Sequence, residues 1–554
     1  MASPLRIVPL GGVGEIGKNM LAIESGDDIL VVDSGLMFPD ESMLGIDLVI
    51  PDVRYLVERR SRVRAIALTH GHEDHMGALP YVLRDLPDVP VYGTKLTLGL
   101  LRTKLKEHRL AERADLREIV PGTPFQVGAL TCDSYAVCHS IPDAVGFTVE
   151  TPFGTIVHSG DWKFDHTPVD GRQTDFARLS AIAAKGVLLL LSDSTRAESA
   201  GYTPSERHVG EMLEGIMARA PGRVITTTFA SNISRIKAII DVAAAWGRKT
   251  AIIGRSMENY TRTARELGYL DVADGALVHP AEISKRPDAE VCIITTGSQG
   301  EPTSALSRMA LGDHRHVTVK EGDTVVMSAS PIPGNEELVS RTVDNLFKLG
   351  AEVVYEPGVR PHVSGHASQE ELKLLLSILR PRHFIPVHGE YRMLVRHARL
   401  AMDLGVAPER AFVVTNGDVV QIGEGGARLA DRVAVGQVYV DGLGVGDVTQ
   451  SVMRDRWSIG SDGIFVIVLS IDRNTGHVVA GPDIVTKGFV PEEDAAELVE
   501  GVKQRIGEGL AEAQTGDHLA EVAALRDEIH STVSKYLYER TKRRPMVIPV
   551  LMEL

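Results

Sequence analysis

The stretch RAIALT-HGHEDH, residues 64–75, is the most informative in the chain. Its first half, residues 64–69, is predicted to be a buried strand, and this strand leads directly into three histidines and an aspartate. Imidazole and carboxylate groups are the ligands that zinc and its neighbours in the divalent series favour. A chance cluster of polar residues in a surface loop is the plain alternative. The position directly after an apolar strand favours a metal site.

The spacing within this strip indicates two metal ions rather than one. In an extended segment side chains alternate, so His70 and His72 point to the same side and can bind one ion. The chain is then expected to turn and present Asp74 and His75 to an adjacent position. Each ion needs about four ligands, which one strip cannot supply. The remaining ligands must therefore come from elsewhere in the sequence.

Three further residues have a similar local setting. His139 lies in YAVCHS, Asp161 in HSGD and His388 in FIPVHGE, and each follows an apolar strand candidate close to a small residue. A lone histidine at a strand end is more often structural than a ligand. Because all three share the same setting, we expect them to complete the metal site, with Asp161 as a carboxylate that bridges both ions.

The run Gly12-Val13-Gly14-Glu15-Ile16-Gly17 is a false signal. It follows a strand candidate and matches the dinucleotide fingerprint GxGxxG. That fingerprint requires a helix to begin at the glycines, so that the helix N-terminus meets the pyrophosphate. Here two more strand candidates follow, at 20–24 and 29–33. We therefore expect a tight turn between strands.

The composition indicates an ordinary globular protein. The 554 residues suffice for two to four domains, and 44% are hydrophobic and 24% charged. The net charge of −15 argues against an overall basic surface but is compatible with a local basic channel for nucleic acid. The three cysteines form no CxxC pair, and we see no secretory signal and no apolar run of membrane-spanning length. We expect a cytoplasmic protein with reduced thiols.

Strand and helix patterns alternate through most of the chain, which indicates α/β layering. From about residue 460 the pattern changes. A hairpin over 463–470 and 476–480, helices near 491–507 and 517–543, and a last strand at 546–551 predict a separate small α/β domain. Further strands are predicted at 5–10, 155–158, 187–192, 224–228, 250–253, 291–295, 324–328, 352–355 and 383–387, and helices at 206–220, 234–246 and 370–379.

The candidate ligands together resemble those of the metallo-β-lactamase fold. The resemblance is closer to one branch of that fold, the β-CASP nucleases. This branch adds an acidic motif, here Ser192-Asp193-Ser194-Thr195, and a histidine in a glycine-containing motif, here Ser364-Gly365-His366-Ala367-Ser368. The stretches PLGG at 9–12, GID at 45–47 and PIPGNE at 331–336 are similar to those of the bacterial ribonuclease J family within this branch.

The resemblance implies an α/β fold with three parts. These are a metallo-β-lactamase αββα sandwich, a β-CASP α/β domain inserted into it, and a small C-terminal α/β domain. The implied boundaries are 1–205 and 356–445 for the two pieces of the metallo-β-lactamase domain, 206–355 for the β-CASP domain, 446–462 for a linker and 463–554 for the C-terminal domain.

The resemblance also assigns a role to each candidate ligand. Two Zn²⁺ ions, or Mn²⁺ as the alternative, would activate a hydroxide that attacks an RNA phosphodiester. Asp74 is expected to accept a proton, and His366, oriented by Asp193, to bind a phosphate oxygen or protonate the leaving oxygen. A cap for the following segment is the alternative role for Asp193. The implied metal ligands are His70, His72 and His139 for one ion, Asp74, His75 and His388 for the other, and Asp161 between them.

Two loops are candidates for RNA contact. Small residues at Ser364, Gly365, His366, Ala367 and Ser368 leave room for a phosphate before the predicted helix at 370–379, and the resemblance implies a 5′-monophosphate there. Ser231 and Asn232 begin another predicted helix and are expected to touch RNA. Asp33 is expected to fix the histidine loop without touching metal. Asp47 and Asp441 are either a structural calcium site, as in some relatives, or ordinary surface carboxylates.

The predicted activity is that of a metal-dependent ribonuclease. The resemblance implies a 5′→3′ exonuclease that prefers 5′-monophosphate ends of single-stranded RNA and also cuts internally, in RNA maturation and mRNA decay. It implies a homodimer or homotetramer, RNA-degradation partners and no membrane. A hydrolase of small esters or thioesters and a non-catalytic RNA-binding subunit are the alternatives. The first has no use for Asp193 and His366, and the second has no use for an intact ligand set.

Overall fold

The computed structural model describes residues 3–40, 42–301, 303–331, 335–472, 478–513 and 522–554. The chain forms two compact units. The first comprises Met1–Phe38 and Leu48–Val438, and the second comprises Pro39–Asp47 and Tyr439–Leu554. The predicted PIPGNE stretch at 331–336 includes residues 332–334, which lie outside the described residues.

Two packed β-sheets form the centre of the first unit. Buried side chains of both sheets, such as Ile23 and Leu30 from one and Phe147 and Leu189 from the other, share one apolar core. The first sheet runs in the order β22 (Gly426–Ala430), β21 (Val419–Gly423), β1 (Leu5–Gly11), β3 (Met20–Ser25), β4 (Asp28–Val32), β6 (Val63–Ala67), β7 (Val91–Gly93) and β8 (Leu116–Glu118). The second runs in the order β19 (His383–Val387), β13 (Val187–Asp193), β12 (Gly154–His158), β11 (Val145–Thr151), β10 (Leu130–Ala136) and β9 (Phe125–Val127).

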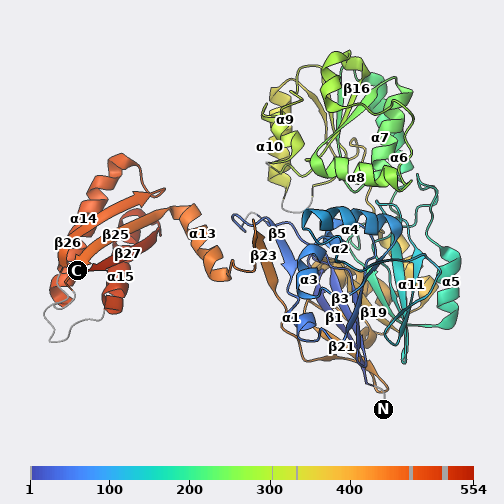
Figure 1. Ribbon diagram of the computed structural model, residues 1–554, viewed down its shortest axis with the longest axis horizontal. Coiled ribbons are helices and arrows are strands. Elements are labelled where there is room, and N and C mark those ends of the chain that lie inside the picture. Colours follow the sequence, from blue (N-terminus) through green and yellow to red (C-terminus); the bar gives the residue numbers. More distant parts are fainter. Residues whose placement is uncertain (1–2, 41, 302, 332–334, 473–477, 514–521) are drawn as a thin grey trace. The chain divides into compact units, whose positions relative to one another are not determined.

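Helices cover the outer faces of the two sheets. Leu179 of α5 (Phe176–Lys185), Leu375 of α11 (Gln369–Leu379) and Ala401 of α12 (Tyr391–Asp403) are buried in one cluster with Leu190 and Phe384 of the second sheet. On the first sheet, α4 (Lys95–Glu107) packs against β7 and β8. The layers are therefore helix, sheet, sheet and helix, which confirms the predicted αββα sandwich (Figure 1).

A second α/β body is inserted into this sandwich. Its sheet is entirely parallel, in the order β15 (Lys249–Ile253), β16 (Val291–Thr295), β14 (Val224–Thr227), β17 (Thr324–Met327) and β18 (Glu352–Val354). Its central strands β16, β14 and β17 are buried along their whole length, as is usual for a parallel sheet covered on both faces. Its helices are α6 (Arg207–Arg219), α7 (Ile233–Ala245), α8 (Arg255–Glu266), α9 (Ala305–Ala310) and α10 (Glu336–Lys348) (Figure 1).

The sandwich resumes after the insert and incorporates both ends of the first unit. Strand β13, which precedes the insert, pairs in parallel with β19, which follows it, so that Leu189 is opposite His383. On the other sheet β1 pairs with β21, and Leu5 lies opposite Ile422. The inserted body thus interrupts the sequence of the sandwich and leaves its sheets continuous.

The second unit carries a three-stranded sheet with two helices packed on it, and helix α13 (Gln450–Asp462) precedes that sheet in the chain. Strand β25 (Ile464–Ile471) pairs antiparallel with β26 (Val478–Lys487) and parallel with β27 (Met546–Glu553). Phe465 and Ile467 are buried against Val502 of α14 (Glu492–Ala513) and Val533 of α15 (Val522–Thr541). This arrangement agrees with the predicted hairpin, helices and last strand, although residues 473–477 and 514–521 lie outside the described residues.

The candidate residues meet at one edge of the sandwich because they follow neighbouring strands. Asp161 comes after β12, Asp193 ends β13 and His388 follows β19, and these three strands are parallel neighbours. The glycine run 12–17 forms no nucleotide-binding helix: the two-residue strand β2 (Val13–Gly14) pairs with β20 (Gly389–Glu390) beside His388. Among the described residues no helix is long and apolar enough to cross a membrane.

Candidate metal centre

The first cluster consists of three imidazoles. The distance from His72 Nδ1 to His70 Nε2 is 3.0 Å, and the distance from His72 Nδ1 to His139 Nε2 is 3.2 Å. Nitrogens bound to one tetrahedral zinc lie about 3.3 Å apart, so the spacing is that of a metal site. His70 follows β6, and His72 caps the short helix α2 (Glu73–Met76). The alternation predicted for His70 and His72 thus brings their ring nitrogens together.

The second cluster adds carboxylates. His75 Nε2 lies 3.5 Å from Asp74 Oδ2 and 3.2 Å from Asp161 Oδ2. The two nitrogens of His388 face both carboxylates: Nε2 is 3.4 Å from Asp74 Oδ2 and Nδ1 is 2.8 Å from Asp161 Oδ1. These four side chains can together hold one metal ion.

Asp161 links the two clusters. Its Oδ2 atom lies 3.8 Å from the Nε2 atoms of both His70 and His139, in addition to its 3.2 Å distance from His75. A single carboxylate oxygen therefore faces ligands of both clusters. This is the position that a bridging ligand requires.

The protonation preferences of the histidines fit a bound cation. Burial lowers the pKa of His70 and His139 well below the usual range, which keeps these imidazoles in the neutral form that binds metal. Burial also opposes charging of His388, but Asp161 and Asp74 outweigh it and raise its pKa to about 10. The buried Nε2 atom of His388 has no hydrogen-bond partner among the described residues. The carboxylates thus favour positive charge here, and an imidazole nitrogen is left without a partner.

Glycines allow the histidine strip to lie close to its neighbours. A Cβ atom at Gly35 would lie 1.6 Å from the carbonyl oxygen of Asp74, so only glycine fits there. Beside it, buried Asp33 accepts hydrogen bonds from the Thr69 amide at 2.8 Å and lies 2.8 Å from His75 Nδ1. This leaves His75 Nε2 free to face the second cluster. Asp33 therefore lies where it was expected, next to the histidine strip and in contact with Thr69 and His75.

Asp193 and His366 form a pair next to the clusters. His366 Nδ1 lies 2.8 Å from Asp193 Oδ2 and 3.8 Å from Asp161 Oδ2. Burial lowers the pKa of His366, but the two carboxylates outweigh it, and the net shift is upward. The other oxygen of Asp193 accepts hydrogen bonds from the amide and hydroxyl of Thr195. One oxygen of Asp193 thus contacts His366, and the other contacts the segment that follows it.

The loop that carries His366 also holds His139. The Gly365 carbonyl lies 2.8 Å from His139 Nδ1, which leaves Nε2 directed at the first cluster. Ser364 Oγ accepts the His366 amide, and Ala367 is buried. Ser368 is also buried and caps α11 in a capping box with Glu371. Ser364 and His366 are the members of this loop that are partly exposed.

The remaining candidate residues lie in other parts of the structure. Asn232 is buried and caps α7 by accepting the Arg235 amide, which leaves its amide nitrogen for other contacts, while Ser231 is half-buried. In the second unit, Asp47 accepts the Gly442 amide at 2.8 Å, and Asp441 pairs with Arg456 at 2.5 Å.

Two neighbours of the centre were not predicted. The Asn19 amide nitrogen lies 3.0 Å from the Asp74 carbonyl and 3.1 Å from His75 Nε2. Tyr260 of α8 reaches across from the inserted body, and its hydroxyl lies 3.4 Å from the Gly71 carbonyl and 3.4 Å from Glu73 Oε1. The glycine run that precedes Asn19 is the sequence feature that could have indicated its contact with the centre. Tyr260 had no signal in the sequence.

This fold and centre define a metallo-hydrolase of the metallo-β-lactamase class that carries a β-CASP insert. The family models agree along the chain. They match "Beta-lactamase superfamily domain" at residues 44–180, "Ribonuclease J, beta-CASP domain" at 221–346, "Zn-dependent metallo-hydrolase RNA specificity domain" at 359–414 and "Ribonuclease J C-terminal domain" at 451–554.

Curated relatives match over nearly the full length. Ribonuclease J2 of Bacillus subtilis is 44% identical over 99% of both chains, and ribonuclease J of Thermus thermophilus is 45% identical over 99% of this chain and 95% of its own. A solved structure of a protein of unknown function from Enterococcus faecalis covers 76% of this chain and 100% of its own, at a TM-score of 0.55 and 16% identity, and shares the fold. The chain belongs to the ribonuclease J family, whose members are metal-dependent ribonucleases. This confirms the predicted family and enzyme class.

Proposed function

We propose that this enzyme hydrolyses RNA phosphodiester bonds with two metal ions, as a 5′→3′ exonuclease that prefers 5′-monophosphate ends and also cuts internally. The observation that carries the proposal is the position of Asp161 Oδ2 between three histidines of the two clusters. A one-metal site has no need for such a shared carboxylate. We propose Zn²⁺ as the metal and Mn²⁺ as the alternative.

The proposed ligands are those predicted from the sequence. His70, His72 and His139 would hold one ion, Asp74, His75 and His388 would hold the other, and Asp161 would be shared between the two sets. When bound, two metal ions supply the Lewis acidity that makes a hydroxide from water near neutral pH and balances charge on the phosphate. Asp74 is half-buried. Burial raises its pKa, but His75 and His388 outweigh burial and hold the pKa well below the usual range, so the carboxylate is ionised at neutral pH. Its proposed role as proton acceptor rests on its position beside His75 and His388.

His366 then acts on the phosphate. Asp193 occupies its Nδ1 atom, and the raised pKa of His366 favours the imidazolium, whose Nε2–H can donate to a phosphate oxygen or to the leaving oxygen. We propose that Ser364, Gly365, His366, Ala367 and Ser368 receive the 5′-phosphate, with Ser364 and His366 in direct contact because they are the exposed members. Ser231 and Asn232 are proposed to touch RNA farther along the strand.

Cleavage of labelled RNA tests this function. With Zn²⁺ or Mn²⁺ present, a 5′-monophosphorylated RNA should be degraded faster than the same RNA with a 5′-triphosphate, and a chelator should stop both reactions. A variant with His70→Ala and His72→Ala should lose activity, whereas His208→Ala, at an exposed position on α6, should retain it. No cleavage by metal-loaded protein, or unchanged cleavage by the double variant, would contradict the proposal.

Metal content tests the number of ions. Two equivalents of Zn²⁺ or Mn²⁺ per chain are expected in the purified enzyme. The variant His388→Ala should reduce the occupancy of the ion held by Asp74, His75 and His388. A single equivalent in the wild-type protein would rule out the two-metal arrangement. The structural calcium at Asp47 and Asp441 is part of this proposal, although Arg456 already supplies a cation to Asp441.

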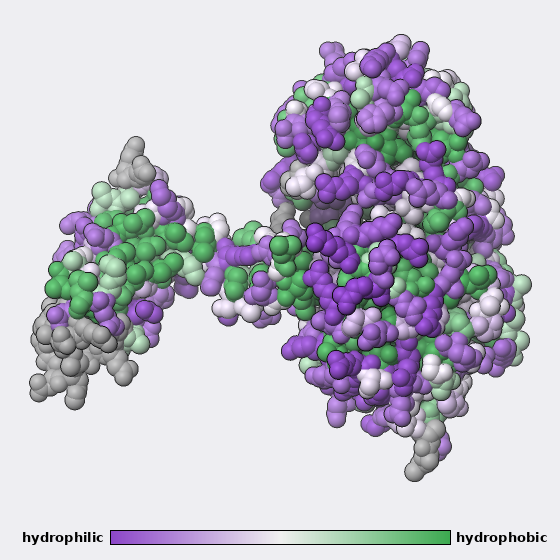
Figure 2. Space-filling model, viewed as in Figure 1, coloured by the Kyte–Doolittle hydropathy of each residue, from purple (hydrophilic) through white to green (hydrophobic). Residues whose placement is uncertain are grey.

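The second unit is proposed to carry self-association into a homodimer or homotetramer. One face of its sheet is covered by helices, but the other face exposes Val485, Ile548, Val550 and Met552 at 37–54% of their surface. Figure 2 shows hydrophobic surface on this unit.

The same proposal includes action in RNA maturation and mRNA decay, RNA-degradation partners, a cytoplasmic location and the predicted domain boundaries. The three cysteines are buried and unpaired, which supports a reducing compartment.

A further inference from the structure

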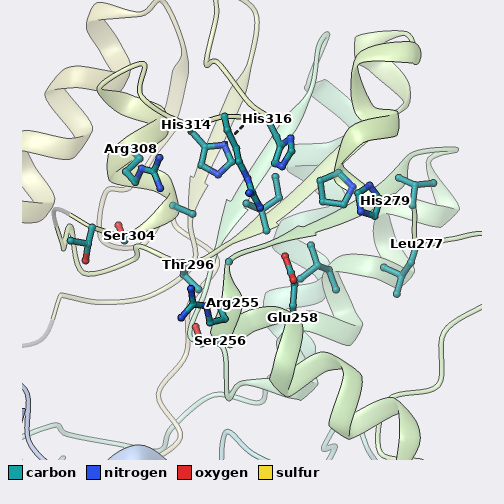
Figure 3. Close-up of a pocket in the computed structure, with 18 residues that line it drawn as sticks. Arg255, Ser256, Glu258, Leu277, His279, Thr296, Ser304, Arg308, His314 and His316 are labelled. Carbon is teal, nitrogen blue, oxygen red and sulfur yellow. Dashed lines mark hydrogen bonds between the residues drawn. The ribbon is translucent and has the colours of Figure 1, made fainter. Parts of the chain in front are cut away.

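The inserted body contains a cavity that the ribonuclease mechanism does not use. Its volume is about 1140 Å³, and it opens at the carboxyl ends of β15 and β16, where α8 begins. Figure 3 shows the side chains that surround it. None of the residues assigned to the metal centre or to the RNA loops lines this cavity.

Cationic side chains predominate around the cavity. Arg255, Arg308 and Arg315 line it, and Glu258 is the one carboxylate of the lining. Three histidines, His279, His314 and His316, also line it, and burial together with the charge of Arg308 lowers the pKa of His314, which favours its neutral form. Such a concentration stands out in a chain with a net charge of −15. Arg308 is partly neutralised by the Asp313 carboxylate, which lies 3.8 Å from its Nε atom. Arg255 and Arg315 form no ion pair within the described part of the chain.

The backbone at the cavity is also suited to an anion. Gly254 precedes α8, and no side chain caps the first turn of that helix. A Cβ atom at Gly254 would lie 2.9 Å from Thr296 Oγ1, and its φ of +117° is one that other residues rarely adopt. The amide groups of a twelve-residue helix therefore open toward the same space as the arginines.

The lining also has apolar members, beside the hydroxyl groups of Ser256, Thr296, Thr303 and Ser304. Ile252, Leu277, Val278 and Ala305 contribute hydrocarbon surface beside the cationic groups. A cavity of this volume is larger than one phosphate needs and slightly exceeds the range of about 300–1,000 Å³ that is usual for small-molecule sites. An apolar wall for a base together with a cationic rim for a phosphate matches the two halves of a nucleotide.

We propose that this cavity binds a nucleotide, with its phosphate at Arg255 and Arg315 and the N-terminus of α8 and its base against the apolar wall. The nucleotide has two sources of the same chemistry, a free nucleoside monophosphate or one residue of an RNA chain that passes the inserted body. The site is separate from the metal centre, so it holds whether or not the two-metal proposal does.

Binding to the metal-loaded full-length enzyme tests the proposal with three probes. These are inorganic phosphate, AMP and a single-stranded RNA 10-mer with hydrolysis-resistant phosphorothioate linkages, each measured by calorimetry. The variant Arg255→Glu with Arg315→Glu should weaken the affected probe roughly tenfold or more, since two charge-assisted contacts are lost. The matched control is Arg207→Glu with Arg219→Glu on α6, which makes the same charge change at exposed positions outside the cavity.

The outcomes separate the sources of the nucleotide. If the cavity variant binds AMP more weakly but binds RNA normally, the site takes a free nucleotide. If it binds RNA more weakly but binds AMP normally, the site takes a residue of an RNA chain. Equal weakening in the control variant, no weakening of either probe, or phosphate binding as tight as AMP would overturn the proposal. A gentler pair, Arg255→Gln with Arg315→Gln, and matching thermal midpoints check that the effect does not come from misfolding.

Discussion

At the scale of single residues, Gly365 shows how the loop at residues 364–368 and the metal centre depend on each other. A Cβ atom there would lie 2.8 Å from His139 Nδ1 and Cε1 and 2.8 Å from Ser140 Oγ. We expect Gly365→Ala to displace His139, lower the metal content per chain and reduce RNA cleavage by about 10- to 100-fold. Elemental analysis and a cleavage assay measure both. Gly425→Ala, whose Cβ meets nothing within 4 Å, is the control, and an unchanged metal content in Gly365→Ala would contradict the prediction.

The buried His397 gives a pH-dependent stability. Burial lowers its pKa to about 3, although Asp193 opposes this shift, and its Nδ1 lies 3.0 Å from Ser194 Oγ. An unfolded chain binds the proton below pH about 6.5, and the folded chain does not, so stability is present above that pH and falls as the pH drops toward 3. Between about pH 7.5 and 5.5, the free energy of unfolding should fall by about 1.4 kcal/mol less in His397→Leu than in the wild type. Denaturant titrations at the two pH values measure it, and parallel pH slopes would contradict it.

At the scale of elements, Arg235 ties three segments of the inserted body together. It is fully buried on α7, pairs with Glu206 before α6, and donates to the carbonyls of Ser328 after β17 and Val363 in the returning chain. Arg235→Leu leaves Glu206 as an unpaired buried charge and should cost about 3–5 kcal/mol.

Denaturant unfolding measures this effect. Lys237→Ala on the same helix breaks the exposed pair with Asp241 and an exposed hydrogen bond to the Asp271 carbonyl, and it should cost less than about 1 kcal/mol. Similar losses in the two variants would show that the buried network does not hold the segments.

Some elements could be predicted from the sequence and others could not. Strands β16 and β19 have the predicted bounds, because both are short apolar runs buried on both faces. Strand β11 was not predicted, and β10 was expected only as a strand that ends before His139. The bounds of β10 could not be predicted, because it buries the polar Asp133 and Ser134 and has no clear apolar alternation. The contacts of Asn19, Tyr260 and Gly365 join distant parts of the chain, and no local pattern encodes them.

At the scale of the whole molecule, the candidate metal ligands all belong to the first unit. Removing residues 450–554 should therefore leave the metal content per chain unchanged. If the exposed face of the β25–β27 sheet carries self-association, the truncated protein should be a monomer. Light scattering after size-exclusion chromatography and elemental analysis measure the two properties. An oligomer of unchanged size would contradict the proposed role of this unit, and metal loss would contradict the independence of the centre.

The interrupted sequence of the sandwich has a consequence during synthesis. Strand β1 cannot pair with β21, and Asp74 of the histidine strip cannot contact His388, until the ribosome has translated the whole insert. At about 5–20 residues per second, a ribosome needs roughly 15–60 s to get from His70 to His388. Throughout that interval the nascent chain lies beside its own messenger RNA without a complete set of ligands. The order of the segments thus delays the assembly of an RNA-cutting centre until almost the entire first unit has been made.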